Sequence, residues 1–207
     1  MGFRRRIVTP ARVLAVLLLA SAGAGGADRA RSPLLDAAAQ LLREGDLPRA
    51  RAAYRELAEA GDPLAQQAMA RILLDALGGA ADRRGAMHWL CRLAHHRDGG
   101  PDVVRAQWYL AEYFRTGGGL PGPRYNDGER AAEDPVKAYF WFGIMAAQQR
   151  HYAQVVASAV TLGQVGMSQV GRQLHEGERQ QVLRALERWA PGEPPRADGD
   201  CLDLPRL

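Results

Sequence analysis

The chain has 207 residues, of which 47% are hydrophobic and 24% are charged, and its formal net charge is +4. This length fits one domain with a substantial hydrophobic core. Four of the 27 basic residues, Arg4, Arg5, Arg6 and Arg12, lie in the first 24 positions, so residues 25–207 carry 23 basic and 23 acidic side chains. A neutral chain offers no electrostatic reason to bind nucleic acid or an anionic membrane.

The first 24 residues have the pattern of a secretory signal peptide. The arginines Arg4 to Arg6 precede the apolar run ARVLAVLLLASAGAGGA, and Ala22-Gly23-Ala24 offers a cleavage site of the A-x-A type. The apolar run is short for a membrane span, and an uncleaved anchor is the alternative. The sequence therefore predicts an exported protein, periplasmic or secreted, with no integral membrane span after cleavage.

The rest of the chain is rich in alanine and has few runs of Val, Ile or Thr, which favours an all-helical fold. A capping side chain stands directly before a proline at 32–33, 62–63 and 134–135, which is typical of helix starts. Glycines at 78–79 and 117–119 are typical of helix ends. We expect four helix pairs, namely 33–44 with 47–60, 62–77 with 83–96, 102–116 with 134–150, and 151–172 with 176–189.

Glycines and prolines distinguish the last helix pair and the end of the chain. Gly163 and Gly166 are expected to bend or interrupt the helix 151–172. Residues 191–207 show no hydrophobic periodicity and contain several prolines and glycines, so we expect a flexible tail. The predicted organisation is a signal peptide at 1–24, a helical repeat domain at 25–190 and a tail at 191–207.

An internal repeat underlies the second and third helix pairs. AQQAMARIL at 65–73 matches AQWYLAEYF at 106–114, and DRRGAMHWLCRLA at 82–94 matches DPVKAYFWFGIMA at 134–146. The matched apolar and small residues recur at helical spacing, so we expect them to form the core between stacked helices. These core positions are Ala65, Ala70, Leu73, Ala86, Trp89, Ala94, Ala106, Ala111, Phe114, Ala138, Trp141 and Ala146.

The repeated pattern resembles a known family. A-Q-x-x-L-A-x-x-[YF], then G-x-G, then D-x-x-K-A-x-x-W-x-x-x-A-A is similar to the Sel1-like repeat, a relative of the tetratricopeptide repeat. The second copy carries the pattern best, whereas the first departs from it at Met69, Leu73, Ala76 and Gly85. The resemblance covers roughly residues 61–147. It implies an all-α fold, an α/α solenoid of about four stacked antiparallel helix pairs, and a role in assembling protein complexes.

The sequence predicts no catalytic or metal site. His88 and His95 share a helix face but lie two turns apart, about 10 Å along the axis, which is too far for one metal ion to bridge. Ser158 lacks a nucleophile motif such as S-x-x-K. Glu176 and Glu178 are expected at a helix start, where carboxylates interact favourably with the helix dipole. We therefore predict a protein that is not an enzyme and needs no cofactor or metal.

The predicted function is an exported repeat scaffold that mediates protein–protein interaction in the cell envelope. Such a scaffold could regulate a sensor or an envelope assembly machinery, and its partner would be another envelope protein. The alternative is a cell-wall-related hydrolase or penicillin-binding protein of the same repeat family. Cysteine-rich secreted relatives of that kind carry regularly spaced Cys pairs, which this chain lacks. A third hypothesis is self-assembly through the ends of the array.

The two copies differ in a way that indicates a partner-binding surface on the helix 102–116. Trp108 corresponds to Gln67 of the first copy, so a large aromatic side chain stands where we expect a solvated polar one. A Trp flanked by arginines is typical of an interface hot spot. The alternative is that Trp108 packs under the long loop at 119–133. The candidate surface, opposite the apolar face of the helix, consists of Arg105, Trp108, Glu112 and Arg115.

The chain contains two cysteines, Cys91 and Cys201. An even number of cysteines in an oxidising compartment is compatible with a disulfide, which here would tie the tail to the array. The alternative is a half-buried thiol at Cys91 and a free thiol in the tail. The sequence leaves both open.

Overall fold

A computed structural model describes residues 32–118, 132–152 and 156–192, which form helices joined by turns. The predicted signal peptide and almost all of the predicted tail lie outside these ranges, so the predicted domain boundaries stay predictions. In chain order the elements are α2 (Pro33–Glu44), α3 (Leu47–Glu59), α4 (Pro63–Leu74), α5 (Arg83–Ala94), α6 (Pro101–Arg115), α7 (Pro135–Ala146), α8 (Gln148–His151), α9 (Ala157–Val170), the short 3-10 helix η1 (Gly171–Gln173) and α10 (Glu176–Arg188).

Three helices begin at the capping residues that the sequence indicates. The side chains of Ser32, Asp62 and Asp134 each accept a hydrogen bond from the backbone N–H three residues later, at 3.2, 2.8 and 3.0 Å. A proline follows each of them in the first turn of α2, α4 and α7. These caps satisfy N–H groups that would otherwise have no partner at a helix start, and proline costs no hydrogen bond there.

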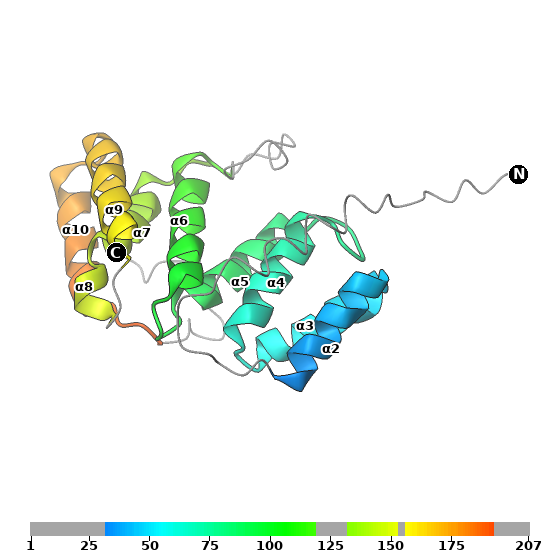
Figure 1. Ribbon diagram of the computed structural model, residues 1–207. Coiled ribbons are helices and arrows are strands. Elements are labelled where there is room, and N and C mark those ends of the chain that lie inside the picture. Colours follow the sequence, from blue (N-terminus) through cyan, green and yellow to red (C-terminus); the bar gives the residue numbers. More distant parts are fainter. Residues whose placement is uncertain (1–31, 119–131, 153–155, 193–207) are drawn as a thin grey trace, which may run out of the picture.

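Helices that are consecutive in the chain pack on one another from α2 to α7. α9 and α10 then both pack on α7, where the sequence leads us to expect a fourth pair. The result is an elongated array with α2 and α3 at one end and α9 and α10 at the other (Figure 1). The fold is all-α, a solenoid of stacked helix pairs, as the sequence predicts.

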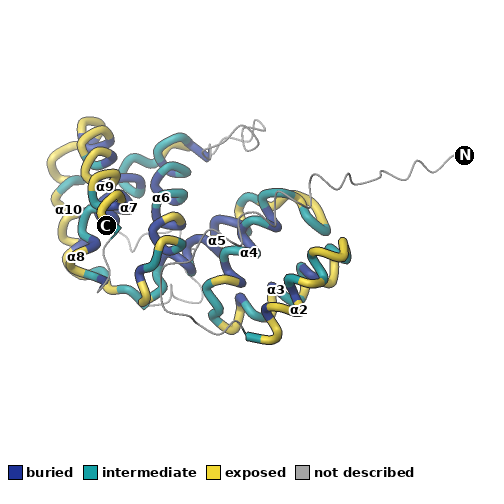
Figure 2. Tube along the Cα trace, in the orientation of Figure 1, coloured by how far each residue is buried: buried dark blue, intermediate teal, exposed yellow. Residues whose placement is uncertain are grey.

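The buried residues run along the sides on which neighbouring helices meet, as Figure 2 shows. Trp89 and Trp141, which match between the two repeats, are 7% and 1% exposed. All the other core positions expected from the repeat are buried too, except Ala146, which is half-buried. Ala146 ends α7, where its backbone lies against Gly163 of α9.

Two helix ends in the third and fourth pairs differ from expectation. α7 stops at Ala146 and the four-residue α8 follows, where one helix to residue 150 is expected. α9 starts at Ala157 and is continuous to Val170, so Gly163 and Gly166 do not interrupt it. A Cβ atom at Gly163 would stand 2.3 Å from the backbone N of Ala146, which explains the glycine by close packing against α7 rather than by a break.

The end of α4 also differs from expectation. α4 ends at Leu74, four residues before the glycine that we expected to stop it. The left-handed position after the helix is held by Ala76, with φ 55°, the only such non-glycine residue in the described part of the chain. Ala76 aligns with Gly117 of the second copy, which has φ 65°. Gly78 also has a positive φ, of 71°, and a Cβ there would stand 2.6 Å from the backbone oxygen of Leu47.

None of the helices in the described ranges combines the length and the apolar character that a membrane crossing requires.

Candidate partner-binding surface

A side-chain hydrogen bond joins the first helices of the two matching repeats. Gln67 on α4 donates from Nε2 to Oδ1 of Asp102 on α6, at 2.6 Å. Arg105, one turn further along α6, places Nη1 3.6 Å from the same oxygen. Asp102 therefore connects α4 with α6 and neutralises Arg105 at the surface.

Gln67 corrects one premise of the sequence analysis. We expected a solvated polar residue at this position, against which Trp108 would stand out. Instead Gln67 is half-buried and bonded to the next repeat. The sequence pattern did not reveal this contact because Asp102 lies outside the aligned segments, 35 residues from Gln67.

Glu112 and Arg115 form a tight ion pair along α6. Arg115 donates from Nε to both carboxylate oxygens, at 3.1 and 3.2 Å, and from Nη2 at 2.5 Å. This hydrogen bonding raises the pKa of Arg115 above its ordinary value. The guanidinium is thus engaged by its own helix, and it contributes a fixed neutral pair to the surface rather than a free cation beside Trp108.

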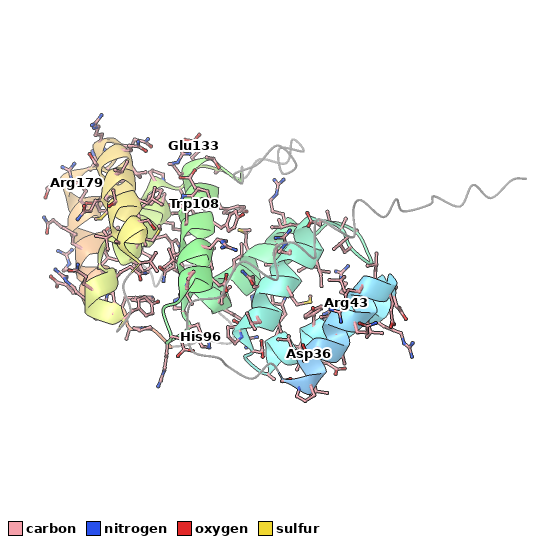
Figure 3. The ribbon with its side chains drawn as sticks, viewed as in Figure 1. Asp36, Arg43, His96, Trp108, Glu133 and Arg179 are labelled. Carbon is pink, nitrogen blue, oxygen red and sulfur yellow. The ribbon has the colours of Figure 1, made fainter. Side chains whose placement is uncertain are left out.

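Trp108 lies on α6 (Figure 3) and is half-buried. It packs against the hydrophobic core, and its ring centroid lies 5.4 Å from that of Tyr109 at an interplanar angle of 44°. Residues 119–131 of the loop that was expected to cover it lie outside the described residues. The structure therefore places one part of the indole in the core and leaves another part accessible.

These contacts define what we call the α4–α6 surface: Gln67, Asp102, Arg105, Trp108, Tyr109, Glu112 and Arg115. The sequence analysis identified four of its members and missed Gln67, Asp102 and Tyr109. Charges on this surface are paired within it, so the Asp102–Arg105 and Glu112–Arg115 pairs leave a neutral area around an aromatic pair. Neutral aromatic areas of this kind are typical of protein interfaces.

Arg115 is the one member of the α4–α6 surface with a shifted pKa, and the other shifted groups in the described part of the chain lie elsewhere. Burial lowers the pKa of His151 and raises that of Tyr152, and both lie at the end of α8. Hydrogen bonds from Gln180 and Arg179 lower the pKa of Glu176 in the first turn of α10. Within the described ranges, no group of three or more His, Cys, Asp or Glu side chains is arranged to hold a metal ion.

Cys91 is fully buried in α5 and takes part in a disulfide. The other cysteine of the chain, Cys201, lies outside the described residues. The pairing of these two cysteines therefore stays a prediction.

Comparison with known proteins finds similarity to a solved structure. No family model matches the chain, and no curated protein matches it. Among solved structures the chain is similar to c5321, a protective antigen present in uropathogenic Escherichia coli strains that displays an SLR fold, with 21% identity and a TM-score of 0.47. The match covers 73% of this chain and 28% of c5321, so the chain spans less than a third of that protein's length. The fold class rests on the helices and their packing described above.

Proposed function

We propose that this chain is an exported scaffold without enzymatic activity that binds another protein of the cell envelope through the α4–α6 surface. The observation that carries the proposal is the hydrogen bond between Gln67 and Asp102, because it joins two repeats into one surface around the half-exposed Trp108. Stacked helix pairs generally use extended surfaces of this type to bind partners.

The composition of the surface supports a protein partner rather than a charged ligand. Its carboxylates are already paired with arginines of the same helix. A strongly charged ligand would have to break these pairs, whereas a neutral protein surface could cover Trp108 and Tyr109 without doing so. Trp and Tyr contribute a large contact area at a small cost in side-chain entropy, which makes them effective anchors.

Export and the envelope location rest on the signal-peptide pattern of residues 1–24. The absence of enzymatic activity is supported by the resemblance of residues 61–147 to Sel1-like repeats. A mass measurement on the protein recovered from its own cells checks the first point: we expect a chain that starts at Gly25 or Asp28. Recovery of the intact chain from Met1 in the cytoplasm would contradict export.

Site-specific photo-crosslinking in the native cell tests the binding surface. A photoreactive amino acid replaces Arg105 in the α4–α6 surface, and in a matched control it replaces Arg184, an exposed arginine of α10. We expect one dominant crosslinked protein from position 105 and none of it from position 184. The same yield from both positions would show that the α4–α6 surface is not where the partner binds.

A further inference from the structure

The segment that follows α10 folds back onto the middle of the array. Trp189 lies against three aromatic side chains, with ring centroids 4.7 Å from His151, 5.8 Å from His95 and 6.3 Å from Tyr152. The backbone N–H of Gly192 donates a hydrogen bond to the carbonyl oxygen of His95. We call these five residues the C-terminal junction. It joins the end of α5, the end of α8 and the end of α10.

The junction is closely packed on its inner side. Gly99, with φ 60° in the turn between α5 and α6, lies so near Tyr152 that a Cβ there would stand 2.2 Å from Cδ1 of the tyrosine. The hydroxyl of Tyr152 accepts a hydrogen bond from Nε2 of Gln107, at 2.9 Å. Burial raises the pKa of Tyr152, so this hydroxyl stays protonated at any physiological pH.

The rings of His151 and Trp189 pack edge to face, and each ring has a buried nitrogen without a hydrogen-bond partner among the described residues. Nε2 of His151 and Nε1 of Trp189 are both buried with no hydrogen-bond partner among the described residues. Neutral imidazole can tolerate this position, because an unpaired neutral nitrogen costs far less than an unpaired buried charge. Protonation would make Nε2 a charged donor in a buried position where it has no acceptor among the described residues.

Arg150 disfavours a proton on His151, and the other charged groups of the junction lie on neighbouring segments. On α8 the adjacent group is Arg150, and burial together with this arginine lowers the pKa of His151. Two charged residues lie in the segment after α5. The side chain of Arg97 lies against Gly192, and the carboxylate of Asp98 is 3.5 Å from His96.

The other segments add one further charge. Arg188 precedes Trp189 at the end of α10, and Gln107 of α6, which is uncharged, bonds Tyr152. His95 lies on the other side of Trp189, with Nδ1 2.9 Å from the carbonyl oxygen of Cys91.

We propose that the C-terminal junction is a proton-sensitive latch, in which protonation of His151 releases Trp189 and Gly192 from the array. The closed latch favours neutral His151, so its stabilising contribution is complete above the unfolded pKa of about 6.5 and is lost as the pH falls from there toward the lowered pKa of the closed state. Opening is local, because Leu186 in the preceding turn of α10 stays packed against Gly143 of α7.

Hydrogen exchange of the Gly192 amide in the full chain reports the latch directly, since this N–H is bonded to His95. Its protection factor, corrected for the intrinsic exchange rate, is measured between about pH 7.5 and pH 5, the range in which histidines titrate. We expect the protection factor to fall as the pH drops, with a total loss of about tenfold for each unit by which the pKa of His151 is lowered. Unchanged protection across this range would overturn the proposal.

Two variants separate His151 from other titrating groups. H151F keeps an aromatic ring but carries no proton, so we expect Gly192 protection that no longer depends on pH. H88F replaces an exposed histidine of α5, and it should retain the pH dependence of the parent chain. The same dependence in H151F as in the parent would assign the effect to another group and overturn the latch.

An NMR titration of the unmodified chain keeps the proposal testable should H151F not fold. The imidazole resonances of His151 and the indole N–H resonance of Trp189 are followed over the same pH range. We expect both to shift with one common midpoint, because opening and protonation are coupled. A Trp189 resonance that stays in place while His151 titrates would overturn the proposal.

Discussion

Gln66 and Gln107 occupy equivalent positions in α4 and α6, and each donates its side-chain N–H to a carbonyl at the end of the preceding helix. Nε2 of Gln66 lies 3.3 Å from the oxygen of Ala58, and Nε2 of Gln107 lies 3.0 Å from that of Ala94. Carbonyls at a helix end have no partner within the helix. Gln107 therefore supplies a donor to Ala94 across the repeat boundary, and Gln66 adds a second donor to Ala58, which also accepts from the backbone N–H of Gly61. The Ala-Gln pair of the repeat thereby fixes how one unit follows the next.

We expect the two glutamines to differ in their contribution to stability. Gln107 also bonds Tyr152 and Gln148, whereas Oε1 of Gln66 has no partner among the described residues. Gln107→Ala therefore leaves several buried polar groups unsatisfied and should lower the free energy of unfolding by about 3 kcal/mol, against about 1 kcal/mol for Gln66→Ala. Urea denaturation of the two variants measures the difference, and equal losses would contradict the role of the network.

Ala76→Gly should stabilise the protein. Ala76 holds a left-handed conformation that costs an L-residue about 1 kcal/mol, and glycine takes the same position in the second repeat. Thermal unfolding should show a higher melting temperature for this variant. Ala80→Gly, in the same exposed turn but without a positive φ, is the control and should give no gain. A lower melting temperature for Ala76→Gly would refute the strain assigned to this residue.

Gly163→Ala and Gly177→Ala make the same chemical change in two helices with opposite expected results. A Cβ at Gly163 would stand 2.3 Å from the backbone N of Ala146 and 2.6 Å from the backbone oxygen of Phe142, so α9 must move away from α7. We expect a loss of about 2 kcal/mol in the free energy of unfolding. At Gly177 nothing lies within 4 Å, and alanine should add up to about 1 kcal/mol. Denaturant unfolding measures both changes in the free energy of unfolding. If Gly163→Ala left this free energy unchanged, the contact between α7 and α9 would be loose.

Trp108→Ala tests the α4–α6 surface once the crosslinked partner has been purified. Because the indole is half-buried against the core, we expect a loss of about 1 kcal/mol in stability together with a loss of about 2 kcal/mol in binding free energy. Calorimetric titration measures the affinity. Leu183→Ala, which truncates an exposed side chain of α10, should leave the affinity unchanged. A large fall in melting temperature with unaltered affinity would assign Trp108 to packing alone.

A thiol titration of the unreduced protein tests the predicted bridge between Cys91 and Cys201. We expect no free thiol in the denatured but unreduced chain, because Cys91 is disulfide-bonded and the chain has two cysteines. Cys201→Ser should then lower the free energy of unfolding by about 2–4 kcal/mol, since the bridge would close a long loop. Two free thiols per chain, or a bridge only in covalent dimers, would exclude the pairing within one chain.

The sequence by itself determined most of the helices and the stacking of α2 to α7 in chain order, but not the packing of α9 and α10 on α7. Proline-linked caps such as Asp62 and Asp134 act within a single turn. The burial of Trp89 and Trp141 follows from the helical spacing of apolar residues in α5 and α7, so caps and core positions can both be predicted without the fold. The tertiary structure alone decided the contacts between residues far apart in the chain, such as Gln67 with Asp102 and Trp189 with His151. Such contacts depend on the distance and the angle between helices. Side-chain volumes at helix crossings such as Gly163 set that distance and angle. The hydrophobic periodicity of the sequence does not reveal which side chains meet at a crossing.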